Sequence, residues 1–209
     1  MSASEVQICN LALLKFGDIT ITSLSASNKE ARACNVLYPL MRDLMVYSHP
    51  WNFAMGRADI SAQLTTTPDF QWDYAYTVPT EAMRVWELYG TDAEWEVEDG
   101  KLLTNQDSEI YIRYIKQVTA TGKFNPAFVN CLALRLGAEL AAKIKGDTKK
   151  RQALLQELHT VELPRAYRLN AIEGKRERSK DEQPMDKGNF TWQTQGHSGE
   201  LLDDKVYST

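Results

Sequence analysis

The stretch "YSHPWNFA", residues 47–54, separates two kinds of sequence pattern and so decides the fold. Before it, apolar residues are spaced by three and four positions, as in a helix; after it they alternate, as in strands. The residue before a proline is disfavoured in the helical conformation, so His49, which precedes Pro50, is predicted to end a helix. The sequence therefore predicts a change from helix to sheet at this corner.

Two helices are predicted before the corner. Residues 4–7, "SEVQ", fit a capping box, in which the Ser and Gln side chains bind free N–H groups of the first turn, and Gly17 is placed to end the helix. This helix has no wide polar face, which predicts that neighbours cover it on several sides. Residues 27–30, "SNKE", repeat the capping pattern and begin a second helix, in which Pro39 is expected to cause a kink or a restart.

Residues 51–122 show the pattern of a small antiparallel sheet of about five strands. In "EWEVEDGKLLT", residues 94–104, Trp95 and Val97 fall on one face and the glutamates on the other. Asp99-Gly100 follows as a hairpin turn, because this dipeptide favours the backbone conformation that a two-residue turn needs.

Helical spacing returns after residue 122. Asn125 is placed to cap a helix with Pro126 in its first turn, where no N–H is needed. A last helix is predicted from about residue 148 to 171, with a bend at Pro164.

Helices on the two sides of the sheet must pack together to bury their apolar stripes. We therefore predict an α+β fold: an antiparallel helical bundle of two N-terminal and two C-terminal helices (residues 1–50 and 123–173) with a β-rich insertion (residues 51–122).

The segment 174–209 is charged, polar and short of aliphatic residues, so it is predicted to be a flexible C-terminal tail in isolation. A few large apolar residues are spaced along it like anchors for a partner. They are Phe190, Trp192, Leu201, Leu202, Val206 and Tyr207.

The composition of the 209 residues is that of a globular protein, with 43% hydrophobic residues and a net charge of -4. This charge argues against a general nucleic-acid-binding protein, which needs an excess of Lys and Arg. We expect no secretory signal and no membrane contact, since no apolar run approaches the roughly 20 residues of a membrane span. Cys9, Cys34 and Cys131 are interpreted as buried thiols of a protein made in a reducing cytoplasm.

Candidate chemical groups have simpler structural explanations. His49, His159 and His197 are scattered, with no Cys or carboxylate at metal-ligand spacing, so His49 is interpreted as part of a helix-ending corner packed by Trp51. The basic stretch "KIKGDTKKR", residues 143–151, could contact phosphate but is interpreted as a solvated turn between two helices.

The glutamates at 94, 96 and 98 could hold a divalent ion or act as acid and base, but the favoured interpretation is the solvated face of a half-buried strand. A less favoured alternative is a hydrolase that uses paired carboxylates. Its candidates are Asp92, Glu94, Glu96, Glu98 and Asp99. Nucleotide-binding and hydrolase motifs are not found, so we predict neither a cofactor nor an enzyme.

Three stretches together resemble the tail tubular protein A family, the head-to-tail adaptor of short-tailed bacteriophages. They are "ICNLALLKFGDITITSLSASNKEARACNVLYPLMRDLMVYSHPWNFA" (8–54), "WEVEDGKLLTNQDSEIYIRYIKQVT" (95–119) and "FNPAFVNCLALRLGAELAAKIKGDTKKRQALLQELH" (124–159). The similarity spans about residues 5–170 and is most specific in the first stretch. There the elements ICNLAL and HPWNFA flank "NKEAR" (28–32), where the family pattern is closer to SKEAR.

The resemblance implies a non-enzymatic structural protein of the virion, assembled in the host cytoplasm. It would form a ring, usually of twelve copies, docked beneath the portal protein and passing the genome to the tail nozzle protein. The C-terminal segments of the family are implicated in gripping the portal, which suggests a role for the predicted anchors. A negative subunit suits a channel that must not hold DNA phosphates tightly. The alternative is a neck or tail-completion protein of another family that shares the architecture.

Overall fold

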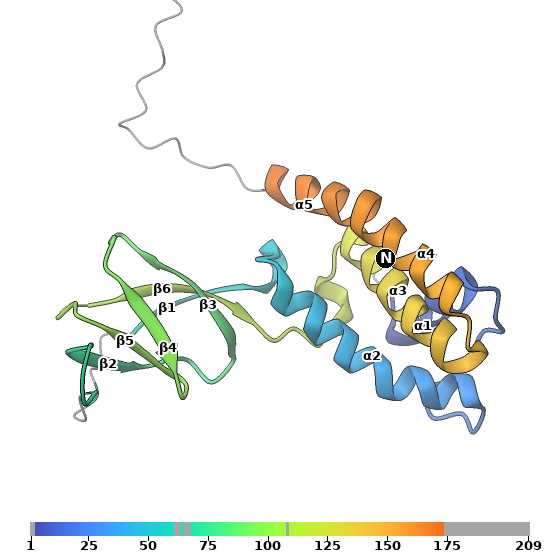
Figure 1. Cartoon of the computed structure of the whole chain (residues 1–209), viewed down its shortest axis with the longest axis horizontal. Helices are drawn as coiled ribbons and strands as arrows, with labels where there is room; N and C mark the ends of the chain where they lie inside the picture. The colour runs from blue at the N-terminus through green and yellow to red at the C-terminus, as the bar shows by residue number, and fades with distance from the viewer. Residues whose placement is uncertain (1–2, 61–63, 65–67, 108, 174–209) are drawn as a thin grey trace, which may run out of the picture. The chain divides into compact units, whose positions relative to one another are not determined.

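The computed structural model describes residues 3–60, 64, 68–107 and 109–173, and these form an α+β protein, as predicted (Figure 1). Helices α1 (Glu5–Lys15) and α2 (Lys29–Ser48) precede the strands in sequence. Helices α3 (Pro126–Leu140), α4 (Thr148–Glu157) and α5 (Leu163–Ile172) follow them.

The two N-terminal helices begin at caps. The predicted capping box of α1 is present: Ser4 Oγ accepts a hydrogen bond from the N–H of Gln7 at 3.2 Å, and the N–H of Ser4 donates to Gln7 Oε1 at 2.8 Å. The cap predicted for α2 is wrong by one residue, because Asn28 caps the helix by accepting from the N–H of Ala31 at 2.9 Å. The Glu30 side chain is buried instead of reaching back to complete a box.

Pro39 lies inside α2, which runs without interruption from Lys29 to Ser48, so the predicted restart is wrong. A proline in a helix leaves the carbonyl four residues earlier without its hydrogen bond. That carbonyl belongs to Asn35, which is exposed to water. The missing bond is therefore tolerated on the outer side of the helix.

The corner after α2 is built from aromatic side chains. His49 ends the helix in an extended conformation, as predicted. Trp51 is fully buried, and its Nε1–H donates to the carbonyl of Met45 at 2.9 Å, which satisfies a group that the helix end leaves free. The Trp51 ring packs edge-on against Phe128 at 5.1 Å, and Phe53 lies 5.4 Å from Phe124.

Helix α3 is central, because it contacts α1, α2, α4 and α5. It begins as predicted, with Asn125 Oδ1 accepting from the N–H of Phe128 at 2.7 Å and Pro126 in the first turn. Its contact with α1 is very close: a Cβ added to Gly137 would lie 2.9 Å from the carbonyl oxygen of Ala12. Only glycine allows this approach without a shift of one helix.

Helix α1 is covered less completely than its sequence predicts. Its residues Ile8, Cys9, Ala12 and Leu13 are buried, mainly where it packs on α3. Leu11 and Leu14, however, are 43% and 59% exposed. One apolar side of α1 is therefore left open to solvent in the single chain.

The three cysteines are buried and unpaired by disulfides, as predicted. A hydrogen bond with Cys34, together with burial, raises the pKa of the Cys9 thiol far above its usual range. Burial raises the pKa of Cys131 to about 12. Both thiols therefore stay protonated and contribute to the core as small apolar groups.

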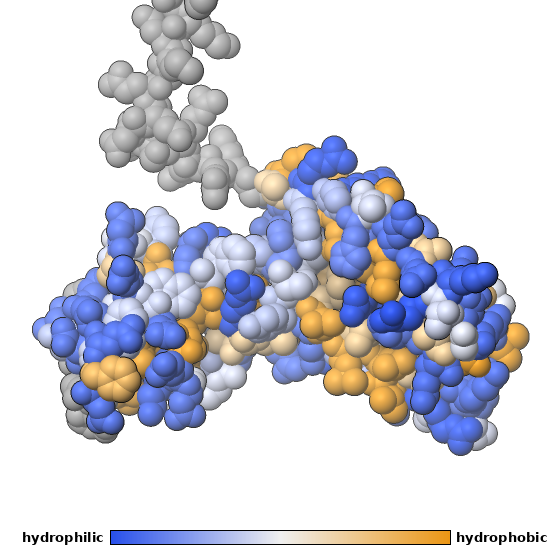
Figure 2. Space-filling view, viewed as in Figure 1, coloured by the Kyte–Doolittle hydropathy of each residue, from blue (hydrophilic) through white to orange (hydrophobic). Residues whose placement is uncertain are grey.

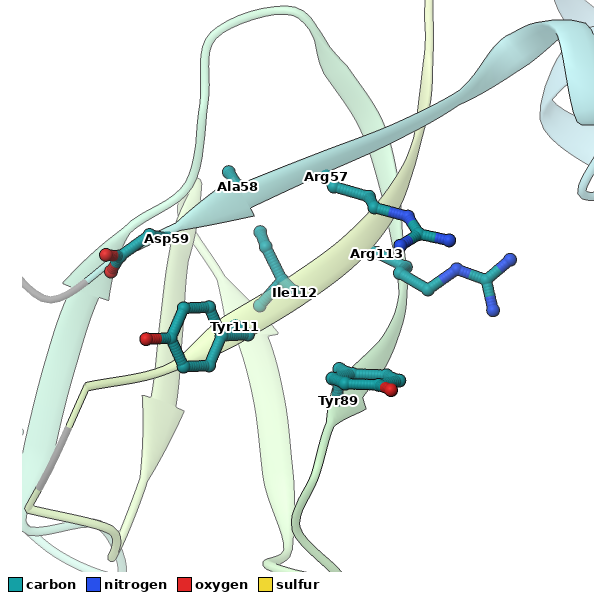
Figure 3. A pocket seen from close by; sticks show the side chains of 7 residues that line it. All are labelled: Arg57, Ala58, Asp59, Tyr89, Tyr111, Ile112 and Arg113. Atoms are coloured by element: carbon teal, nitrogen blue, oxygen red, sulfur yellow. The ribbon is translucent and has the colours of Figure 1, made fainter. Parts of the chain in front are cut away.

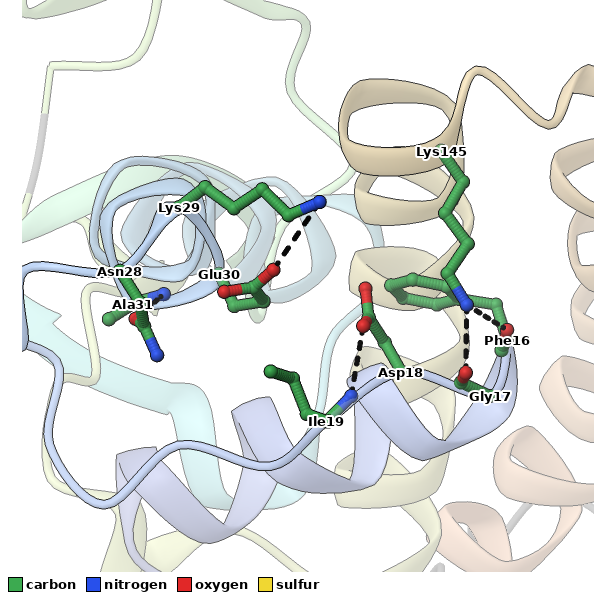
Figure 4. A network of polar contacts seen from close by, with 9 residues as sticks. All are labelled: Phe16, Gly17, Asp18, Ile19, Asn28, Lys29, Glu30, Ala31 and Lys145. Carbon is green, nitrogen blue, oxygen red and sulfur yellow. Dashed lines mark hydrogen bonds and ion pairs between the residues drawn. The ribbon is translucent and has the colours of Figure 1, made fainter.

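Helix α3 continues into a π-helical turn, Ala141–Lys145, which ends at Gly146. Lys145 Nζ donates to the carbonyls of Gly17 at 2.7 Å and Phe16 at 3.3 Å, so it binds the end of α1 (Figure 4). Asp147 then caps α4 by accepting from the N–H of Lys150 at 2.8 Å. The basic stretch 143–151 thus includes the predicted turn, which is formed by Gly146 and Asp147, while its other residues belong to the π-helical turn and to α4.

The last predicted helix contains two α-helical segments, α4 and α5, joined by a π-helical turn at Leu158–Glu162. Pro164 lies in the first turn of α5. A proline has no N–H for the regular helical bond, and the change of helix type directly before it accounts for the predicted irregularity.

The strands form two antiparallel sheets instead of the single sheet predicted. The first has the order β1 (Met55–Asp59), β6 (Tyr111–Lys116), β3 (Ala82–Tyr89). The second has the order β2 (Tyr74–Thr77), β5 (Lys101–Thr104), β4 (Trp95–Glu98).

The two sheets share one apolar core, to which Val85 and Ile112 contribute from the first sheet and Tyr76 and Leu102 from the second. Alternation in the sequence shows which face of a strand is buried but not which strand is its partner. The predicted turn between β4 and β5 is present: Glu98 pairs with Lys101 around Asp99 and Gly100, whose φ angles are 47° and 71°.

Candidate subunit interface

Helix α2 carries an exposed apolar stripe along its outer side. Its members follow one another at intervals of four, four and three residues, which places them on one face of the helix. The opposite face, with Cys34, Tyr38 and Met45, is buried in the core. The stripe consists of Val36 (61% exposed), Leu40 (58%), Leu44 (46%) and Tyr47 (45%), and we call it the α2 stripe.

A groove beside α2 extends this surface. It has a volume of about 810 Å³ and runs between α2 and the π-helical turn after α3. Val36 belongs to both the α2 stripe and the groove, whose apolar walls include Leu37 and Ile144. Figure 2 shows apolar side chains gathered on the helical part of the chain around α2. The groove and the stripe together form one continuous apolar surface with Lys29, Arg32 and Lys143 at its border.

Other apolar side chains are exposed on different helices. Leu169 and Ile172 on α5 are 44% and 79% exposed, and Val161 in the preceding π-helical turn is 54% exposed. Leu11 and Leu14 on α1 add a further group. A subunit with several separate apolar surfaces can contact one neighbour with each of them.

His49 packs between α2 and α5, which confirms its interpretation as part of a helix-ending corner. Its ring stacks on Tyr167 at 4.0 Å and lies edge-on to Trp51 at 4.9 Å. Its Nε2 is 3.5 Å from Asn170 Nδ2. Burial lowers the pKa of His49, so the neutral imidazole is favoured in the folded protein. Within the described residues, no three potential metal ligands come together.

The acidic residues around β4 are exposed, as the solvated-face interpretation predicts. Glu96 and Glu98 lie on the strand, and Glu94 directly precedes it. Of the five carboxylates considered for a hydrolase, Glu94 lines an open depression of about 470 Å³ with Thr91, Ala93, Asn105 and Gln106. Among the described residues that line this depression, Glu94 is the one carboxylate.

The six predicted anchors lie outside the described residues and stay a prediction. They are Phe190, Trp192, Leu201, Leu202, Val206 and Tyr207. The α2 stripe, in contrast, is not among the features predicted from the sequence. The regular spacing of Val36, Leu40, Leu44 and Tyr47 is a signal that could have revealed a second apolar face.

None of the helices in the described ranges has the length and apolar character that crossing a membrane requires. Comparison with protein-family models and with curated protein sequences finds no match.

Proposed function

We propose that this chain is a structural subunit of a short-tailed bacteriophage: a head-to-tail adaptor that forms a ring between the portal protein and the tail nozzle protein. The genome passes through the channel of the ring. The α2 stripe is the observation that carries this proposal, because it leaves the folded chain with an apolar face whose exposure to water is unfavourable. The resemblance of the three quoted stretches to the tail tubular protein A family supports this choice of assembly.

The arrangement of exposed apolar groups supports a ring more than a symmetric pair. A two-fold dimer uses the same patch on both partners, whereas a closed ring joins two different patches on each subunit. The α2 stripe and the exposed residues of α5 are two such patches on separate helices. In this proposal the helices form a bundle, the β region is an insertion in it, and residues 174–209 form an extended tail.

The free energy of one apolar contact indicates how such a ring would be stabilised. Burying the exposed half of four large apolar side chains contributes on the order of 4 kcal/mol. Association of two proteins costs roughly 4–15 kcal/mol in lost freedom, so one such contact is marginal by itself. Closure of the ring, further polar contacts and the portal as a template would supply the rest. The anchors at Phe190, Trp192, Leu201, Leu202, Val206 and Tyr207 are the proposed portal contacts.

The test is the molar mass of the full-length chain in solution, measured by light scattering with and without the portal protein encoded in the same genome. Leu40→Glu places a charge in the middle of the α2 stripe, and Asn35→Glu places the same charge at an exposed, polar position of the same helix. We expect the unmodified chain and Asn35→Glu to form ring-sized assemblies, alone or on the portal. Leu40→Glu should remain a folded monomer.

Two outcomes would contradict the proposal. One is an unmodified chain that stays monomeric at every concentration and never binds the portal. The other is a Leu40→Glu variant that assembles as well as Asn35→Glu. Circular dichroism of each variant confirms that the helices are intact, which is expected because Leu40 is 58% exposed.

A further inference from the structure

The outer face of the sheet β1-β6-β3 presents two arginines side by side. Arg57 on β1 pairs directly with Arg113 on β6, which in turn pairs with Glu87 on β3. In the next row, Asp59, Tyr111 and Tyr89 pair across the same strands. Figure 3 shows the side chains of Arg57 and Arg113 extending together above the ring of Tyr89. We call this surface the arginine face.

An open pocket of about 390 Å³ lies on this face and is lined by Arg57, Arg113, Tyr89 and Tyr111, among others. Like charges directly opposite each other in a sheet destabilise it, so the pair needs compensation. Glu87 Oε1 binds Arg113 Nη1 at 2.6 Å and compensates one of the two. Within the described part of the chain, Arg57 is exposed and forms no salt bridge. Asp59 lines the same pocket, but no salt bridge joins it to Arg57 among the described residues. The Arg57 guanidinium is therefore available to a carboxylate from outside.

The opposite charge is found in excess elsewhere on the same chain, along β4. This strand is at the edge of the sheet β2-β5-β4, and Glu96 and Glu98 extend from its outer face. Among the described residues of this region, Asp99 is the one carboxylate that forms a salt bridge. Its Oδ2 lies 3.7 Å from Lys101 Nζ. Charges on an edge strand discourage pairing with foreign strands. Glu98 lies opposite Lys101 in the sheet, whereas Glu96 lies opposite Leu103. Neighbouring carboxylates along β4 repel one another, and a cationic partner would relieve that repulsion.

We propose that the arginine face of one subunit binds the acidic strand β4 of the next subunit in the ring. The inference rests on the proposed ring and names a polar contact in it, separate from the α2 stripe. Two carboxylates two residues apart on a strand are separated by roughly 6.6 Å, and two residues opposite each other in an antiparallel sheet by about 5 Å. Arg57 and Arg113 can therefore face Glu96 and Glu98 as two pairs.

This contact has the symmetry that a ring requires. The cationic and the anionic surfaces are different parts of one chain, so binding can join one side of a subunit to the other side of its neighbour, as in a closed ring. Complementary charge also fixes the register between neighbours and disfavours wrong contacts, because misaligned subunits would bring like charges together.

A second copy suits the arginine face better than nucleic acid does. A phosphate backbone is a long, uniform row of negative charge and requires several cations in line. On this face Glu87 lies in the row of the arginines and Asp59 lies in the next row, and both would repel such a backbone. A short anionic segment, such as the two glutamates of β4, needs two cations only, and this face offers two arginines.

The experiment exchanges the charges of one pair. Arg57→Glu and Glu96→Arg each place like charges across the proposed contact, and the double variant restores opposite charges at every interface of a ring. Matched controls make the same charge changes at exposed positions elsewhere, Lys149→Glu and Asp69→Arg. Self-association of the full-length chain is measured by sedimentation velocity at low and moderate salt, alone and with the portal protein. Binding of a double-stranded DNA fragment is measured in parallel.

We expect each single variant to weaken self-association by ~10-fold or more, the double variant to recover most of the loss, and the controls to match the unmodified chain. The loss should shrink as salt screens the charges. The inference is overturned if the single variants assemble normally, if the double variant assembles no better than they do, or if Arg57→Glu reduces only DNA binding. If the single variants assemble normally and Leu40→Glu does not, the proposed contact is ruled out and the proposed ring is retained. An unmodified chain that never assembles would rule out both the contact and the ring.

Discussion

Asn170 on α5 and Asn52 after α2 bind each other through two hydrogen bonds, although 118 residues separate them in sequence. The N–H of Asn52 donates to Asn170 Oδ1 at 2.9 Å, and Asn52 Nδ2 donates to the carbonyl of Asn170 at 2.6 Å. Asn170 Nδ2 also donates to the carbonyl of Pro50 at 3.2 Å. A single buried amide on the last helix therefore holds the corner at which the chain leaves the helices.

Replacing this amide should destabilise the protein. Asn170→Leu has a similar volume but leaves the N–H of Asn52 and the carbonyl of Pro50 without their partners. We expect the free energy of unfolding to fall by about 2–4 kcal/mol, measured by urea denaturation. Arg168→Leu, at an exposed position of the same helix, should change it by less than ~0.5 kcal/mol. Equal effects of the two substitutions would show that the amide bonds do not matter.

Gly137→Ala should also be destabilising, although alanine is the better helix former. The gain in helix propensity is about 1 kcal/mol. The new methyl group, however, would lie 2.9 Å from the backbone oxygen of Ala12, and overpacking a core costs about 1–3 kcal/mol. We expect a net loss of about 1 kcal/mol in urea denaturation. A stabilised variant would mean that α1 moves away from α3 at little cost.

His49 should make the stability depend on pH. Burial lowers the pKa of His49 below its ordinary value of 6.5, so the folded state binds the proton less readily than the unfolded state. Stability is therefore complete above the unfolded pKa and falls as pH decreases from about 6.5 towards the lower pKa of the folded state. His49→Phe keeps a ring that can stack on Tyr167 and should flatten this part of the profile. A slope unchanged in His49→Phe would assign the effect to another group.

A chain ending at Glu173 tests the predicted anchors. The truncation keeps α5 and its contacts with the corner, including the contact of Asn52 Nδ2 with Glu173 Oε2 at 3.5 Å, so we expect the shortened chain to fold. If residues 174–209 bind the portal, the shortened chain should dock on it at least ~10-fold more weakly in a pull-down titration. Unchanged docking would rule out an anchoring role for that segment.

The two ends of α1 and the start of α3 could be predicted because their causes are local. Ser4, Asn125 and Gly17 act on backbone groups within a few residues, so the sequence nearby contains the whole explanation. The pairing of the strands could not be predicted in the same way. The choice of β6 as the centre of one sheet and β5 as the centre of the other depends on contacts between distant segments.

The candidate interface could not be predicted, for a different reason. Leu40 and Leu44 have the same chemistry as residues that are buried within the subunit, and nothing in the sequence states which apolar side of α2 faces the core. The anchors after residue 173 were chosen by composition alone. The arginine face also depends on pairing, since Arg57 and Arg113 are far apart in sequence and meet only when β1 pairs with β6.

The aromatic contacts at the corner join the two ends of the β region. Trp51 and Phe53 stand where the chain leaves α2, and Phe124 and Phe128 stand where it returns to α3. Because these contacts hold the two ends together, we expect the packing of the helices not to depend on the strands between them. We expect that the β region can be exchanged for one of another length without loss of the helical packing.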